Sequence, residues 1–186
     1  MQADPARAAT VQPDDGGPPR SLIIAAVVLT LAAIAAVLAF AGARRTPPAP
    51  VAVAAVPAPQ AESPECQSLL ATLPDRLGDY RRADTAQPTP AGTAAWRVGG
   101  EPVVLRCGLS RPAEFVVGSP IQMVDGVQWF RLEDPQSPLA TWLCVDRPVY
   151  VALTLPTGSG PTPIQAMSDV IDRTMGAIPI RPAPAR

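Results

Sequence analysis

An uninterrupted apolar run near the amino terminus constrains this chain more than any other feature. Residues 21–43 contain no charged residue and no proline. These 23 residues exceed the roughly 20 that an α-helix needs to cross the hydrocarbon core of a bilayer. Arg20 precedes the run and Arg44 follows it, at the positions where long cationic side chains reach lipid headgroups. We therefore predict a single transmembrane helix over 21–43, with the lipid bilayer as its partner.

A cleaved signal sequence is the main alternative for this run. Ala39-Phe40-Ala41 has the small-x-small pattern of a cleavage site, but the apolar part of a signal peptide is only about 7–15 residues long. The arginines do not fix the orientation, because two precede the run and two follow it. The proline-rich linker and the cysteines favour a cell-membrane protein with a cytoplasmic amino terminus and an extracytoplasmic domain.

Proline-rich segments divide the rest of the chain. Residues 44–63 combine five prolines with many alanines, a composition typical of an extended spacer. Residues 64–180 carry the apolar patterns of one domain of ordinary size. We predict a disordered cytoplasmic tail over 1–20, a linker over 44–63, an extracytoplasmic domain over 64–180 and a disordered tail over 181–186.

Two helices are predicted at the ends of this domain. Ser63 is a good helix cap, Pro64 suits the first helical position, and the apolar residues that follow have helical spacing. A second apolar stripe of helical period begins after Thr162 and stops before Gly176.

Strands are predicted between the helices. The β-rich runs are 102–107, 121–124, 127–130, 139–145 and 149–155, and Asp125-Gly126 is a strong hairpin signal between the second and third. Residues 78–94 are polar and turn-rich and are expected to form a loop. The expected fold class is α+β, with a small antiparallel sheet covered by an N-terminal and a C-terminal helix.

Several short motifs in this domain occur in a recognisable order. They are Cys66 with Leu73-Pro74, Ala95-Trp96, Leu105-Arg106-Cys107-Gly108, Gly126-Val127-x-Trp129, and Arg147 followed by Tyr150-Val151. This order resembles the actinobacterial membrane-protein family called domain of unknown function 3515. The resemblance covers about residues 64–172 and implies an envelope location behind one N-terminal span. It implies no activity, since none is established for the family.

Three missing residue types remove several kinds of chemistry. The chain has no histidine, no lysine and no asparagine. Without histidine there is no imidazole base and no histidine metal ligand, and without lysine there is no Schiff-base chemistry. A net charge of −1 gives no reason to expect nucleic-acid binding. We expect a protein that is not an enzyme and that uses no cofactor, metal or nucleic acid.

The three cysteines point to a disulfide. No CxxC motif is present, and a zinc site would need an acidic fourth ligand without any histidine. We predict a Cys66–Cys107 bond, whose loop of roughly 40 residues stabilises the fold by about 3–4 kcal/mol. Cys107–Cys144 is the competing pair if those two strands are neighbours. Otherwise Cys144 is a buried free thiol, and a nucleophilic role for it lacks a base.

Four residues are candidates for ligand binding or for an ion pair. Arg106 and Arg147 lie in or beside strands, where a guanidinium needs a partner such as Asp146 or Glu101, or binds an anion. Trp129 is either a core residue or a stacking surface for a ligand such as a glycan.

These observations favour a non-catalytic binding or accessory module of the cell envelope, whose partner is an envelope protein or a cell-wall ligand. One alternative is a hydrolase that uses carboxylates only, with Glu133-Asp134 as the candidate pair. The other is a structural subunit of a membrane protein, held through its alanine-rich span.

We predict that one of the three thiols is free in the native, membrane-extracted protein and that all three are free after reduction. Alkylation followed by intact mass measures both numbers, and peptide mapping then assigns the free thiol to Cys144. Three free thiols before reduction would contradict the extracytoplasmic assignment, because disulfides persist in oxidising compartments.

Overall fold

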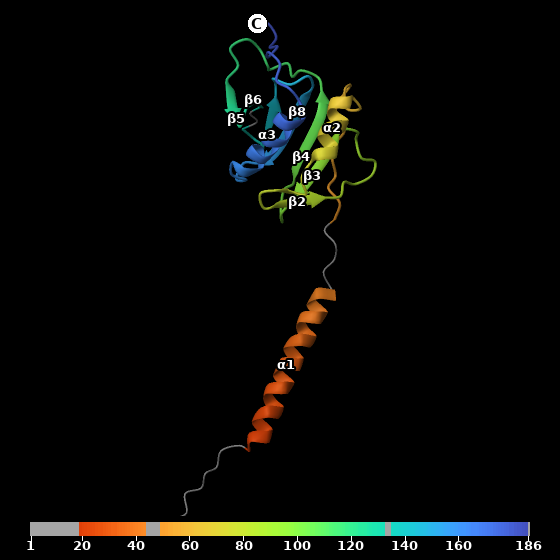
Figure 1. The fold of residues 1–186 in the computed structure, drawn as a ribbon, viewed down its shortest axis with the longest axis vertical. Helices are drawn as coiled ribbons and strands as arrows, with labels where there is room; N and C mark the ends of the chain where they lie inside the picture. The colour runs from red at the N-terminus through yellow and green to blue at the C-terminus, as the bar shows by residue number, and fades with distance from the viewer. Residues whose placement is uncertain (1–18, 44–48, 133–134, 186) are drawn as a thin grey trace, which may run out of the picture. The chain divides into compact units, whose positions relative to one another are not determined.

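A computed structural model describes residues 19–43, 49–132 and 135–185 (Figure 1). The chain divides into two units, Met1–Pro48 and Ala49–Arg186. The first contains α1 (Arg20–Ala43), which by length and composition is able to cross a membrane. The Thr30 hydroxyl, the one side-chain polar group in the middle of α1, donates to the carbonyls of Ala26 and Val27, so the helix satisfies it internally.

The second unit is built on one eight-stranded antiparallel sheet. Its strands are β1 (Arg76–Leu77), β2 (Tyr80–Ala83), β3 (Thr93–Arg97), β4 (Val103–Leu109), β5 (Ile121–Val124), β6 (Val127–Leu132), β7 (Leu139–Cys144) and β8 (Tyr150–Pro156). They lie side by side in the order β1-β2-β3-β4-β8-β7-β6-β5, so β4 and β8 join the two meanders. The predicted Asp125-Gly126 hairpin is confirmed: both residues have a positive φ, as a tight turn between β5 and β6 requires.

Two helices pack on one face of the sheet, which confirms the predicted α+β class. They are α2 (Pro64–Thr72) and α3 (Thr162–Thr174). Ser63 caps α2 as predicted, because its Oγ accepts a hydrogen bond from the Cys66 backbone N–H at 3.3 Å. Apolar residues of both helices join Trp96 and Trp129 of the sheet in the largest buried cluster. We call this side the helix face.

Irregular segments cover the opposite face. Near β3 and β4 the buried Val51 packs against Ala95 and Val104. Near β6 to β8 the buried Phe115, from the segment after β4, packs against Phe130 with ring centroids 5.4 Å apart. The sheet is therefore sandwiched between helices on one side and extended chain on the other.

This cover corrects two of the predicted boundaries. The spacer predicted over 44–63 is too long, since its described part from Ala49 belongs to the folded unit and the Val51 N–H donates to the Asp84 carbonyl at 2.7 Å. The disordered tail predicted over 181–186 is also wrong for its described residues, because Ala183 pairs with Val116. In the first segment Val51 and Val53 pack against the sheet face, although proline and alanine dominate the composition.

The loop predicted over 78–94 is a further correction. It contains β2, and β3 begins at its end. The arginines that disguised β2 are tolerated because one of them, Arg82, lies over the Trp96 ring with its guanidinium carbon 4.9 Å from the centroid.

The predicted disulfide joins α2 to β4. Cys66 and Cys107 are bonded, with their Cα atoms 5.7 Å apart, and Cys144 is the free, buried cysteine. The competing Cys107–Cys144 pair is excluded by topology: both residues lie opposite Val151, one on each side of β8.

We predict that Gly108→Ala destabilises the fold strongly. Gly108 sits at a bulge beside Cys107 with a φ of +84°, and an added Cβ would lie 2.2 Å from the Gln60 carbonyl carbon. Overpacking against backbone and the left-handed conformation together should lower the free energy of unfolding by about 3 kcal/mol. Denaturant unfolding of the full chain, followed by tryptophan fluorescence, measures this.

Gly99→Ala is the matched control. Gly99 also has a positive φ, +62°, but an added Cβ meets nothing within 4 Å. It should cost only about 1 kcal/mol for the backbone conformation. Equal losses for the two variants would show that the close approach of residues 60–61 to β4 is not tightly packed.

Candidate functional site

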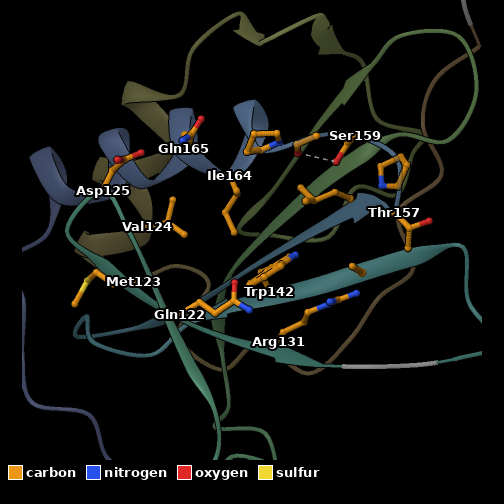
Figure 2. Close-up of a pocket in the computed structure, with 15 residues that line it drawn as sticks. Gln122, Met123, Val124, Asp125, Arg131, Trp142, Thr157, Ser159, Ile164 and Gln165 are labelled. Carbon is orange, nitrogen blue, oxygen red and sulfur yellow. Dashed lines mark hydrogen bonds between the residues drawn. The ribbon is translucent and has the colours of Figure 1, made fainter.

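A cleft opens where α3 leaves the helix face of the sheet uncovered (Figure 2). Its volume is about 460 Å³. The floor comes from β5, β6, β7 and β8, and the roof from the β8–α3 loop and the first turn of α3. The lining residues are Gln122, Met123, Val124, Asp125, Arg131, Ala140, Trp142, Leu155, Pro156, Thr157, Ser159, Gly160, Pro161, Ile164 and Gln165.

The floor of the cleft is apolar with one cation on it. Trp142 and Arg131 lie opposite each other on β7 and β6, and the guanidinium carbon is 5.5 Å from the indole centroid. Figure 2 shows Gln122 beside Trp142, whereas the Met123 side chain points away from the cleft. This alternation follows from the pleat, because successive residues of a strand face opposite sides of a sheet.

The rim of the cleft carries amides, hydroxyls and few charges. Gln122 and Gln165 supply amide groups, and Thr157 and Ser159 supply hydroxyls. Asp125 is the single carboxylate among the described lining residues. An apolar floor with hydrogen-bonding groups around it is suited to holding a ligand, whereas hydrolysis by two facing carboxylates needs a second acid besides Asp125, and the described lining residues supply none.

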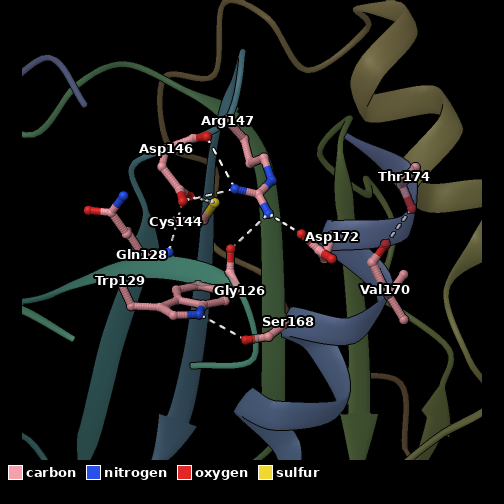
Figure 3. A network of polar contacts seen from close by, with 10 residues as sticks. All are labelled: Gly126, Gln128, Trp129, Cys144, Asp146, Arg147, Ser168, Val170, Asp172 and Thr174. Carbon is pink, nitrogen blue, oxygen red and sulfur yellow. Dashed lines mark hydrogen bonds and ion pairs between the residues drawn. The ribbon is translucent and has the colours of Figure 1, made fainter. Parts of the chain in front are cut away.

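Asp146 and Arg147 form a buried network next to the turn between β5 and β6 (Figure 3). The Arg147 guanidinium lies 2.9 Å from the Asp146 carboxylate and 2.7 Å from the Asp172 carboxylate on α3. It also donates to the Gly126 carbonyl at 3.2 Å. Asp146 in turn accepts from the Gln128 backbone N–H at 3.1 Å. The network therefore fastens the hairpin turn and α3 to the segment after β7.

Burial limits what this pair can do. The side chains of Arg147 and Asp146 are 0% and 2% exposed, and their charges are turned toward each other. Asp172, whose side chain is 56% exposed, is the solvent-facing end of the network. Asp146 and Arg147 thus form an ion pair with each other. Of the two possibilities that the sequence left open for Arg147, a protein partner or a bound anion, the structure shows the protein partner.

Arg106 and Trp129 have hydrogen-bond partners other than the charged groups of this network. Arg106 donates to the Ala54 carbonyl at 3.5 Å, forms no ion pair with Glu101, and burial lowers the pKa of its guanidinium. Trp129 is fully buried, and its Nε1 donates to the Ser168 hydroxyl at 2.9 Å. In this conformation Trp129 contributes to the core and presents no surface to a ligand.

Cys144 lies beneath the same network. Its Sγ is 3.6 Å from an Asp146 carboxylate oxygen, to which it donates. Burial, reinforced by that negative charge, raises the pKa of the Cys144 thiol far above its ordinary value. The thiol therefore stays protonated at neutral pH and is a poor nucleophile.

The remaining candidates concern acids and metals. Glu133-Asp134, the proposed carboxylate pair, lies outside the described residues. Among the residues that the structure does describe, no group of three or more acidic or cysteine side chains is arranged to hold a metal ion.

A family model described as protein of unknown function (DUF3515) matches residues 27–180. The chain belongs to this family. The match begins inside α1 and extends through the α+β domain as far as Ile180, which confirms the family resemblance drawn from the order of the sequence motifs. No curated protein and no solved structure matches the chain.

Sequence reasoning for this DUF3515 member missed the cleft and Asp172. Trp142 and Arg131 belong to different strands, and only their register brings them together. Asp172 lies on the exposed side of a helix, where an acidic residue is common and does not by itself indicate a site. The one usable signal was the shortness of the apolar helices, which cannot cover every strand.

We predict that Arg147→Met destabilises the protein by about 3–5 kcal/mol, because it leaves the buried Asp146 charge without its partner. Asp172→Asn should cost only about 1 kcal/mol, since Asp172 is largely solvated. Denaturant unfolding of the full chain in detergent compares the two variants. Small, equal losses would contradict the role of Arg147 as the anchor of this network.

Proposed function

We propose that this protein is a single-pass, membrane-anchored binding module of the cell envelope. In this proposal α1 stays in the cell membrane with the amino terminus in the cytoplasm, and the domain from Ala49 onward is extracytoplasmic. The cleft beside β5 to β7 holds the ligand, which is a segment of an envelope protein or a cell-wall component. The module has no catalytic role of its own.

The observation that carries this proposal is the chemistry of the cleft. Binding sites are concave, mostly apolar and edged by a few polar groups that fix orientation. The Trp142 and Leu155 floor and the amide and hydroxyl rim have this character, and the volume of about 460 Å³ suits a small ligand or a short segment of a larger one.

Two further observations support the location. The disulfide between Cys66 and Cys107 favours an oxidising compartment. The apolar side chains of α1 are exposed over its described length, so they require a lipid or protein environment.

The scarcity of candidate bases among the described residues of the cleft supports a non-catalytic role. The sequence contains no histidine, the cleft is lined by a single described carboxylate, and the free thiol is protonated at neutral pH. Binding is then the function that the described residues are best able to perform.

We predict that a photo-crosslinking amino acid placed at Gln122 captures the ligand in living cells that produce the full chain. Gln122 is exposed and faces the cleft floor, so a bound ligand lies within its reach. Intact mass and gel mobility of the protein after irradiation distinguish a small adduct from a macromolecular one. The same crosslinker at Met123, which points away from the cleft, is the control.

A cleft-filling substitution makes this test specific. Gln165→Trp places an indole in the cleft and should abolish the adduct at Gln122, whereas Gln67→Trp on the exposed side of α2 should not. Equal capture from Gln122 and Met123, or capture that survives Gln165→Trp, would contradict binding in the cleft.

A further inference from the structure

Three arginines stand in a row across one end of the sheet. Arg76 on β1 lies directly opposite Arg81 on β2, and Arg81 lies directly opposite Arg97 on β3. Directly opposed residues of an antiparallel pair project from the same face, with their Cβ atoms about 4.5–5.5 Å apart. We call Arg76, Arg81 and Arg97 the arginine row.

The arginine row is on the face opposite the helices. The neighbouring pair, Arg82 and Trp96, belongs to the helix face, because Trp96 is in the cluster that α2 and α3 cover. Residues one step along each strand project the other way. The row therefore lies on the same face as Val51 and the first residues of the folded unit.

In the part of the chain that the structure describes, no carboxylate forms an ion pair with the row. Among the described residues, neither Asp79 nor Glu101 in the adjacent turns forms an ion pair with any of its three arginines. The Arg97 guanidinium donates from Nη1 to the Ala49 carbonyl at 2.8 Å, and its buried Nε has no partner. Like charges placed opposite each other destabilise a sheet, so the row is a cost to the fold that an external anion would offset.

The covalent chain limits how far this row lies from the end of α1. Arg97 contacts Ala49, and Ala49 follows the last residue of α1, Ala43, by only six residues. Even a fully extended chain of six residues spans no more than about 22 Å. If α1 is in a bilayer, the Ala49 end of the domain is held within that distance of the membrane surface.

We propose that the arginine row binds the phosphate headgroups of anionic lipids in the membrane that holds α1. This rests on the membrane anchor of the proposed function. Guanidinium groups bind phosphate oxygens through paired hydrogen bonds, and three of them in a row span several headgroups. The contact presents a defined face of the domain to the bilayer and leaves the cleft residues, which belong to the other end of the strand order, free for a ligand.

Energy transfer between the domain and the lipid surface tests this proposal. The full chain is reconstituted into nanodiscs that contain a headgroup-labelled acceptor lipid. A donor dye is attached to Val98→Cys, an exposed position next to Arg97. The native cysteines do not compete for the dye, since two are bonded and Cys144 is buried.

The expected result is a dependence on lipid charge and on the row. Adding phosphatidylglycerol to phosphatidylcholine discs should raise transfer from position 98, and high salt should reverse the rise. Each arginine near an anionic surface shifts the contact equilibrium by about fivefold, so Arg76→Gln, Arg81→Gln and Arg97→Gln combined should abolish the rise. Single Arg81→Gln should lower the transfer without lowering thermal stability, because it also removes opposed charges.

The matched control removes the same charge elsewhere. Arg111→Gln, Arg173→Gln and Arg181→Gln combined should leave the transfer unchanged. The proposal would be overturned if energy transfer from position 98 did not change with phosphatidylglycerol content, or if both triple variants reduced it equally. Alkaline carbonate extraction separates the two hypotheses: a protein that is extracted lacks the anchor, whereas an anchored protein with charge-independent transfer lacks only the headgroup contact.

Discussion

Covering a wide sheet with little helix is the constraint on which the rest of this structure depends. Eight strands at about 4.8 Å spacing form a sheet whose outer strands are about 34 Å apart. The helices available are α2 of 9 residues and α3 of 13 residues, only about 14 and 20 Å long at 1.5 Å per residue. Two helices of this length are too short to cover both apolar faces of the sheet. Helices therefore cover part of one face, and extended segments cover the other.

The two faces of the sheet are covered in different ways. On the helix face the disulfide holds α2 against β4, α3 packs beside it, and the strands β5 to β7 remain partly open as the cleft. On the other face, extended segments around Val51, Phe115 and Ala183 replace helices.

Local signals predicted much of this fold. Ser63-Pro64 starts α2, Asp125-Gly126 makes the β5–β6 turn, and the Cys66–Cys107 bond forms between a helix and a strand that were both predicted. The prediction failed where tertiary contacts override composition. The arginines of β2 made that segment resemble a polar loop, and the surrounding prolines and alanines made the segment around Val51 resemble a solvated spacer. The cleft could not be predicted from the sequence, because its walls depend on the register of four strands and on the residue at which α3 begins.

We propose that α1 anchors the domain on the outer side of a membrane, and the accessibility of the domain in intact cells tests this proposal most directly. Val117 is 60% exposed in the segment after β4, so Val117→Cys offers a reactive thiol while Cys144 stays buried. We predict that a membrane-impermeant maleimide labels this cysteine in intact cells and that the labelled protein remains in the carbonate-resistant membrane fraction. Labelling only after permeabilisation, or a labelled protein released from the membrane, would contradict it.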